Sequence, residues 1–184
     1  MSIKQDEHPL KKVCIICAKG AIEDVYATLV MANGAVMEGI EAKVFFTFFG
    51  LDAITKKQMN KLHTSTVGNP AMRMPGGIPF PTILGGLPGV EAGVSSMMKK
   101  QMEDLDMPPV DEFLDMITAG GGEIFACKLA TDMFKLEMKD LSDHVKDIIT
   151  IGDFYALAGG LNTNNDEKKE TNNKNRHETK KEKE

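Results

Sequence analysis

Two short apolar runs, one on each side of an amphipathic segment, constrain the fold of this chain most. The first run is Val13 to Cys17, and the second, Ala42 to Phe49, reads AKVFFTFF. Runs of this length, rich in β-branched and aromatic residues, are typical of strands buried on both faces of a parallel sheet. Between them, apolar residues recur every three or four positions from Ala21 to Met37, which predicts an amphipathic helix. Together the three segments predict a βαβ unit with a right-handed crossover.

The same alternation continues along the chain. Two further apolar runs, 123–127 and 145–151, predict strands, and the segments with helical periodicity are 54–63, 91–105, 110–119, 132–139 and 153–158. Alternating strands and helices are typical of the α/β class. We therefore predict a single flavodoxin-like domain, with a parallel sheet flanked by helices. In the flavodoxin-like strand order the first and third strands are neighbours, so we expect the strand at 13–17 to lie beside the strand at 123–127.

Shifts in composition set the boundaries of this domain. A chain of 184 residues is long enough for one compact core. We expect the domain at 12–160, after a flexible N-terminus at 1–11. Residues 161–184 contain no large apolar side chain after Leu161, so we expect a disordered charged tail. An insertion at 69–93 is rich in proline, glycine and methionine, and we expect no regular element there.

The apolar part of this insertion leaves two interpretations open. Residues 78–94 carry one charge, Glu91, but their prolines and glycines argue against a transmembrane helix, whose backbone must satisfy its own hydrogen bonds. We expect this segment to pack on itself or on a partner subunit, because exposed apolar patches mark contacts, and this predicts a homo-oligomer. The alternative is a peripheral membrane contact through 78–94.

Charge and the N-terminus restrict the partners and the location. The formal net charge of -5 provides no basic field, so we do not expect nucleic acid as a partner. No apolar run precedes Val13, so we expect no secretory signal and a cytoplasmic protein. Three cysteines in a reducing compartment are too few for a disulfide framework and predict free thiols.

Cys127 is the strongest candidate for chemistry. It ends a predicted strand and comes directly before a helical segment, so it should lie in the crevice at the carboxyl edge of the sheet. The start of the helix and the neighbouring Lys128 would both favour the thiolate, which is the nucleophilic form of cysteine. The other interpretation is a structural cysteine of the core, because free cysteine is often buried.

The remaining motifs give no second site. Cys14 and Cys17 form a C-x-x-C inside a predicted strand, where residues three apart point to opposite faces, so we expect no disulfide between them. The sequence offers no convincing set of four zinc ligands. Its Gly120-Gly121-Gly122 run precedes a strand, whereas a phosphate-binding loop follows one. We therefore predict neither a metal nor another cofactor.

Three segments resemble the DsrE/DsrF-like family, and in particular its DsrE2-type branch, which also carries a peroxiredoxin-like label. These segments are Lys19 to Leu51, Gly121 to Leu136 and IGDFYALA at 151–158. The resemblance implies a flavodoxin-like sheet, homo-oligomers and a cysteine that carries persulfide sulfur. In this family the sulfur passes between rhodanese-like or TusA-like proteins and sulfur-oxidising or thiolation machinery. Cys127 stands where the family has its sulfur-carrying cysteine.

The resemblance therefore implies an intracellular sulfur carrier, a sulfurtransferase-like relay rather than a conventional turnover enzyme. No cysteine follows Cys127, so a relay thiol would have to be Cys17 or belong to a partner. The chain lacks a peroxidatic Pro-x-x-x-Thr-x-x-Cys motif, and we assign no peroxidase activity. The alternative is a non-catalytic oligomeric binding or scaffold module with a structural Cys127. Exposure of the Cys127 sulfur should distinguish the two.

Overall fold

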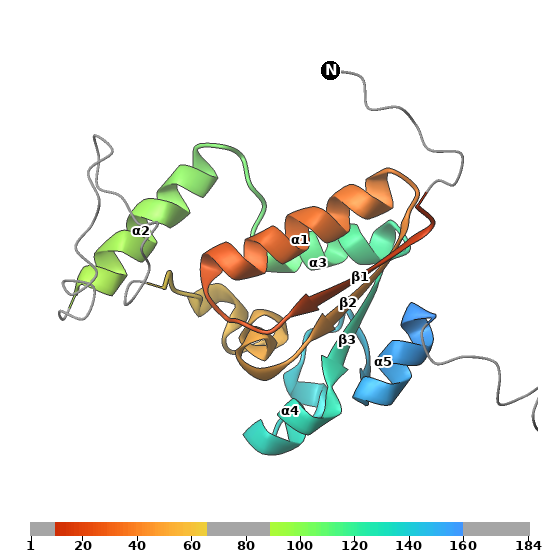
Figure 1. Ribbon diagram of the computed structural model, residues 1–184. Helices are drawn as coiled ribbons and strands as arrows, with labels where there is room; N and C mark the ends of the chain where they lie inside the picture. The colour runs from red at the N-terminus through yellow and green to blue at the C-terminus, as the bar shows by residue number, and fades with distance from the viewer. Residues whose placement is uncertain (1–9, 66–88, 160–184) are drawn as a thin grey trace, which may run out of the picture.

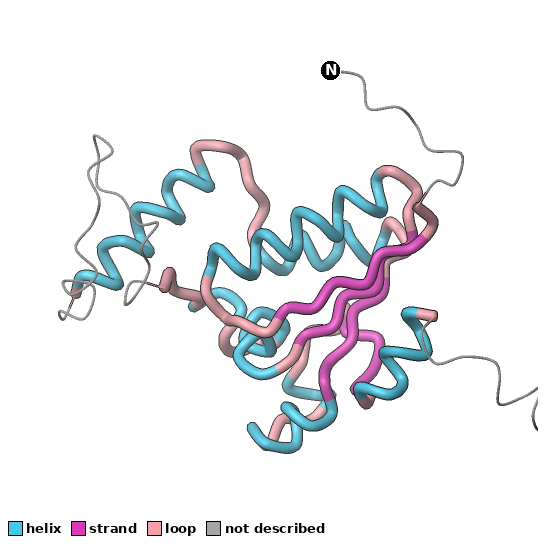
Figure 2. The backbone as a smooth tube through the Cα atoms, viewed as in Figure 1, coloured by secondary structure: helices cyan, strands magenta, loops and turns pink. Residues whose placement is uncertain are grey.

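The computed structural model describes residues 10–65 and 89–159. Its centre is a parallel sheet of four strands in the order β1-β2-β3-β4 (Figures 1 and 2). The strands are β1 (Lys12–Cys17), β2 (Glu41–Phe46), β3 (Glu123–Cys127) and β4 (Val145–Ile149). The predicted α/β class, with a parallel sheet flanked by helices, is confirmed.

The strand order differs from the flavodoxin-like order that we expected. β1 pairs with β2 and β2 pairs with β3, so β2 separates the first strand from the Cys127 strand. The prediction that these two strands are neighbours is therefore wrong. Each crossover here moves to the next strand in the same direction, whereas a flavodoxin-like sheet reverses direction after its second strand. The apolar runs contain no signal for that reversal, because every strand of such a sheet is buried in the same way.

Helices cover both faces of the sheet. On one face lie α1 (Ile22–Met37) and α3 (Val110–Ala119), side by side, and on the other face lies α5 (Ile151–Ala158) (Figure 1). The helix α4 (Lys128–Phe134) continues directly from β3, and α2 (Val90–Glu103) lies farther from the sheet. The strands therefore end at an edge formed by α4 and by the turns after β1 and β2.

Local sequence explains where two of these helices begin and end. Glu23 and Asp24 lie in the first turn of α1, where the helix dipole favours negative charge. Gly39, with a φ of 73°, follows its last turn in the left-handed region that glycine tolerates best. At the start of α5, Thr150 and Asp153 form a capping box.

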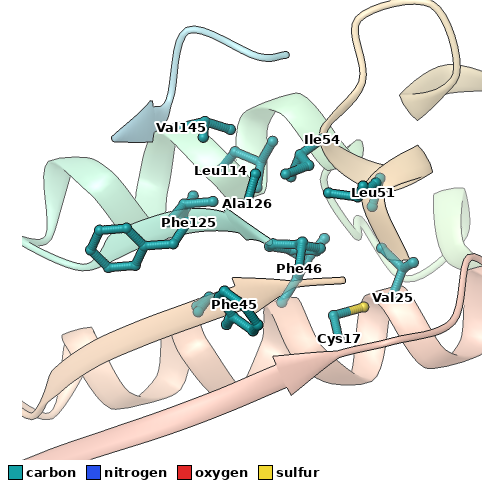
Figure 3. Packing of buried hydrophobic residues seen from close by; sticks show 14 of the residues in the cluster. Cys17, Val25, Phe45, Phe46, Leu51, Ile54, Leu114, Phe125, Ala126 and Val145 are labelled. Atoms are coloured by element: carbon teal, nitrogen blue, oxygen red, sulfur yellow. The ribbon is translucent and has the colours of Figure 1, made fainter. Parts of the chain in front are cut away.

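The core lies mainly between the sheet and the pair α1 and α3. β2 is its centre, because all of its residues except Glu41 are buried. Figure 3 shows Cys17, Val25 and Phe46 packed together within this layer. On the opposite face the rings of Phe45 and Phe154 stack at 4.6 Å between centroids. The packing of α5 on the sheet therefore depends on an aromatic pair.

Several predicted boundaries need correction. β2 ends at Phe46, before the predicted end at Phe49, and the chain turns into the 3-10 helix η1 (Phe48–Ile54). The predicted helix at 54–63 is instead the end of η1 and a second 3-10 helix, η2 (Met59–Lys61). The predicted helix at 132–139 begins earlier, as α4, and is followed by the 3-10 helix η4 (Met138–Asp140). Close backbone packing in the turn after β2 overrides the strand propensity of Phe48 and Phe49.

The predicted helix at 91–105 is confirmed as α2, so the expectation of no regular element in the insertion does not hold for residues 90–93. Residues 69–88 lie outside the described residues, as do most of 1–11, most of 78–94 and all of 161–184. Within the described part of the chain, no helix is long and apolar enough to cross a bilayer.

Candidate functional site

Cys127 lies at the carboxyl end of β3, as the sequence predicts. It pairs with Ile149 of β4 and is also the N-cap residue of α4, with φ and ψ of -73° and 119°. The pair before it, Phe46 with Ala126, joins β3 to β2. This is the edge at which open parallel sheets place their ligands.

The Cys127 residue is nevertheless buried. Only 2% of its surface is exposed. A nucleophilic sulfur must meet its reaction partner, so chemistry at Cys127 requires local opening of the residues around it. The short helix α4 starts at the next residue.

Lys128 faces solvent. Its ammonium donates to both oxygens of the Asp132 carboxylate, one turn along α4, at 3.1 and 3.2 Å. The Lys128 side chain is 56% exposed. The charge that the sequence suggested for stabilising the Cys127 thiolate is thus shared with a carboxylate.

Cys17 does not meet Cys127. It pairs with Phe46, which pairs with Ala126, so these three side chains lie in one row on the α1 face of the sheet. Cys127, one residue after Ala126, falls on the opposite face, because side chains alternate along a strand. The sheet and one intervening strand therefore separate the two sulfurs.

The chemistry of Cys17 is that of a protonated thiol. Its residue is 2% exposed, and its sulfur donates to the Lys19 carbonyl oxygen at 3.5 Å. Burial raises the pKa of the Cys17 thiol, against opposing hydrogen bonds from the Thr28 side chain and at the Lys19 backbone. Cys17 is therefore a weak nucleophile at neutral pH.

Cys14 is the exposed cysteine, and it lies toward the amino end of β1. Cys14 pairs with Lys43, whereas Cys17 lies three residues further along the strand. Cys17 is therefore at the same end of the sheet as Cys127, and Cys14 is not. Partial burial of the sulfur raises the pKa of Cys14, and the nearby Lys12 opposes this. The three cysteines, all free, thus occupy three separate environments.

Apolar side chains are exposed around the Cys127 end of the sheet. On α4, Leu129 and Met133 are 63% and 53% exposed. Phe49 of η1 is 64% exposed, and its ring lies 5.9 Å from that of Phe134. These four residues, which we call the η1–α4 surface, are grouped beside the end of β3. Sequence reasoning missed them, because α4 was expected to begin later.

A hollow opens at the same edge but on the β1 side. Its volume is about 500 Å³, and its polar lining includes Asp52, His63 and Glu91. Burial raises the pKa of the Asp52 carboxyl. Cys127 is not among the residues that line this hollow, so the thiol and the hollow are separate features of the edge. No group of three or more metal-binding side chains occurs within residues 10–65 and 89–159.

Comparison with known proteins identifies the family. The family model described as DsrE/DsrF/DrsH-like matches residues 9–164. The chain belongs to the DsrE/DsrF/DrsH-like family. The resemblance noted in the sequence is thereby confirmed.

Curated relatives of this DsrE/DsrF/DrsH-like chain include one with a named role. The chain is 32% identical over 151 residues to the sulfur carrier protein DsrE2 of Allochromatium vinosum, which covers 81% of this chain and 93% of the relative. It is 24% identical over 137 residues to the uncharacterized protein YrkE of Bacillus subtilis, covering 73% of this chain and 84% of that protein. Membership in a sulfur-relay family is thus supported over most of the chain.

Among solved structures, the fold is similar to the crystal structure of the ychN protein from E. coli. The TM-score is 0.48 and the sequence identity is 16%, over 81% of this chain and 92% of that chain.

Proposed function

We propose that this protein is a sulfur carrier in which Cys127 accepts sulfane sulfur as a persulfide and passes it to a thiol on another protein. Support comes from the position of Cys127 at the carboxyl end of β3, in a chain 32% identical to a sulfur carrier protein. The other two cysteines fit this role less well, since the Cys17 thiol already donates to the Lys19 carbonyl oxygen and burial raises its pKa, and Cys14 lies away from this edge.

The proposed reaction is a displacement at sulfur. The Cys127 thiolate attacks the outer sulfur of a donor persulfide, R–S–SH, and displaces the donor thiolate R–S⁻, which leaves Cys127–S–SH. An acceptor thiolate then attacks the outer sulfur of this persulfide and releases the Cys127 thiolate. Each step breaks one S–S bond and forms one, so neither an oxidant nor a reductant is consumed. The protein is in this sense a relay rather than a conventional enzyme.

Burial of Cys127 defines the second candidate function. A residue that is 2% exposed is also what a structural cysteine would be, and the η1–α4 surface offers an apolar contact. The alternative is therefore a non-catalytic oligomeric scaffold. In the sulfur-carrier proposal, the sulfur becomes accessible through local opening at the start of α4.

The proposed partners are a second copy of the chain and thiol proteins of the rhodanese-like or TusA-like kind. The proposed setting is the reducing cytoplasm, where all three cysteines would remain free. Light scattering at micromolar concentration should give a mass that is a multiple of 20.1 kDa. A mass near one chain would remove the oligomer from this proposal.

A transfer experiment tests the proposed function. The full-length protein is incubated with polysulfide, freed from the excess and offered a small acceptor thiol, and the transferred sulfur is measured. We expect transfer by the wild type and by Cys14→Ser and Cys17→Ser, and none by Cys127→Ser. Circular dichroism checks that each variant is folded. Undiminished loading and transfer by Cys127→Ser would end the sulfur-carrier proposal and leave the scaffold function.

A further inference from the structure

Thr47 continues β2 by one residue at the level of Cys127. The last β2–β3 pair is Phe46 with Ala126, and Thr47 and Cys127 are the next residues of their strands. Thr47 keeps an extended backbone, with φ and ψ of -140° and 161°, and its amide donates to the Cys17 carbonyl at 2.9 Å. The sheet geometry therefore extends through Thr47, and neighbouring strands lie about 4.8 Å apart.

The side chains of Thr47 and Cys127 share one face of the sheet. Phe46 and Ala126 point toward the α1 face, so the residues that follow them point to the opposite face. On that face Phe45, two residues before Thr47, stacks on Phe154 of α5. Thr47 and Cys127 thus occupy adjacent positions on two neighbouring parallel strands, at the edge where the strands end.

The Thr47 hydroxyl is available for a partner. The residue is half-buried, and its side chain does not cap η1, the helix that follows it. Its amide and carbonyl are both occupied, because the carbonyl accepts from Gly50 N at 3.0 Å. Among the described residues, no hydrogen bond of this hydroxyl is found. This hydroxyl can donate to an ionised sulfur, and a hydrogen bond to a charged group is stronger than one between neutral groups.

The turn after Thr47 holds it in place. Phe48 has a φ of 46°, an uncommon backbone conformation for an aromatic residue. Gly50 packs its α-carbon against the carbonyl of Cys17, so no larger residue fits there without a shift. Strained and tightly packed turns of this kind preserve the geometry of the residues beside them.

We propose that the Thr47 hydroxyl donates a hydrogen bond to the Cys127 sulfur when that sulfur is ionised, either as the thiolate or as the terminal persulfide anion. The inference rests on the sulfur-carrier function proposed above and adds a second residue to its site. The hydrogen bond stabilises the nucleophilic form before attack and the persulfide anion after it. Lys128, which is paired with Asp132, is less suited to this task.

The test compares the thiolate population of Cys127 in matched variants of the full-length protein. Iodoacetamide alkylation of the Cys127 peptide is followed by mass spectrometry at about pH 7 and about pH 10, conditions on either side of an ordinary thiol titration. The rate at about pH 7 divided by the rate at about pH 10 reports the ionised fraction of Cys127, because local opening affects both rates alike. Thr47→Val removes the hydroxyl and keeps the shape, and we expect this ratio to fall about tenfold.

Two controls make the result specific. Thr47→Ser keeps the hydroxyl and should restore the ratio to within about twofold of the wild type. Thr28→Val removes a hydroxyl that donates to Asp24 O and lies near Cys17, so it should leave the Cys127 ratio unchanged. An unchanged ratio in Thr47→Val, or an equal fall in Thr47→Ser, would overturn the inference.

Polysulfide loading of the same variants separates this inference from the proposed function. If wild-type Cys127 takes up sulfur while Thr47→Val loads at the wild-type rate with an unchanged ratio, the carrier function stands and the role of Thr47 fails. If Cys127 never takes up sulfur but the ratio falls in Thr47→Val alone, the hydrogen bond stands and the carrier function fails.

Discussion

The two ends of the sheet use their polar groups differently. At the amino end a chain of ion pairs crosses all four strands, formed by Lys12, Glu41, Lys43, Glu123 and Lys146. At the carboxyl end the Cys127 thiol and the Thr47 hydroxyl follow the last β2–β3 pair, and neither takes part in an ion pair among the described residues. Charges that satisfy one another stabilise a fold, whereas unengaged groups at a ligand-binding edge are available for chemistry. We therefore expect changes at the amino end to alter stability and changes at the carboxyl end to alter sulfur transfer.

The electrostatics of the amino end support this division. Lys43 is only 7% exposed, and burial lowers the pKa of its ammonium, but hydrogen bonds to Glu123 and Glu41 outweigh burial and raise it overall. Hydrogen bonds from Lys146 and Lys43 lower the pKa of Glu123. The buried cation thus depends on its carboxylate partners.

The largest effect on stability is expected for Gly50→Ala. Gly50 follows β2 at the carboxyl end of the sheet, so this variant tests whether stability depends on the amino end alone. A β-carbon at Gly50 would overlap the Cys17 carbonyl oxygen and lie 2.8 Å from its carbon, and both are backbone atoms of the sheet. We expect a loss of about 3 kcal/mol in the free energy of unfolding by denaturant. Gly34→Ala in α1, where a β-carbon meets nothing within 4 Å, should instead stabilise by about 1 kcal/mol. Equal stability of the two variants would show that the turn after β2 is loosely held.

A smaller effect is expected for Glu123→Gln at the amino end. The change weakens the ion pairs of Glu123 with Lys43 and Lys146. Lys43 keeps Glu41 as its partner, so we expect the free energy of unfolding near neutral pH to fall by about 1–3 kcal/mol. Because the pKa of Glu123 is lowered by folding, its contribution is present above its ordinary value of 4.5 and is lost as pH falls through the folded value. The difference in the free energy of unfolding between Glu123→Gln and the wild type should therefore become smaller below pH 4.5.

Two further measurements complete the Glu123 prediction. Asp143→Asn removes an exposed partner of Lys56 and should leave stability unchanged. Sulfur loading of Cys127 in Glu123→Gln should match the wild type under conditions where the variant is folded. Impaired loading in that folded variant would contradict the separation between the two ends.

The smallest effect is expected for Lys128→Met. The Lys128 ammonium is exposed and already shared with Asp132, so its influence on Cys127 is screened. We expect the alkylation rate of Cys127 at about pH 7 to fall about twofold, well short of the effect of Thr47→Val. A tenfold fall would assign the stabilisation of the thiolate to Lys128 instead.

Sequence reasoning found the parts of this edge that depend on local pattern. The run at 123–127 and the helix after it were enough to place Cys127 at the end of a strand, and β1, α1 and α3 begin and end within a residue or two of their predicted limits. The strand order could not be found, because it depends on the direction of each crossover. The burial of Cys127 also depends on packing between distant segments.

Thr47 shows most clearly why part of the site could not be predicted. In the sequence it lies inside the run AKVFFTFF, which has the propensity of one continuous strand. The chain turns away from the strand after Thr47 because Gly50 must pack on the end of β1, which is a contact between segments about thirty residues apart. A single polar residue near the end of an apolar run was the one signal available.

The central claim is that buried Cys127, rather than exposed Cys14, is the sulfur-bearing cysteine. The most direct measurement is peptide-resolved mass spectrometry of the native wild-type protein after incubation with polysulfide, which locates the added sulfur on individual cysteines. We predict a persulfide on Cys127 in larger amount than on Cys14, although Cys14 is the exposed residue. A persulfide on Cys14 with Cys127 unmodified would contradict the account.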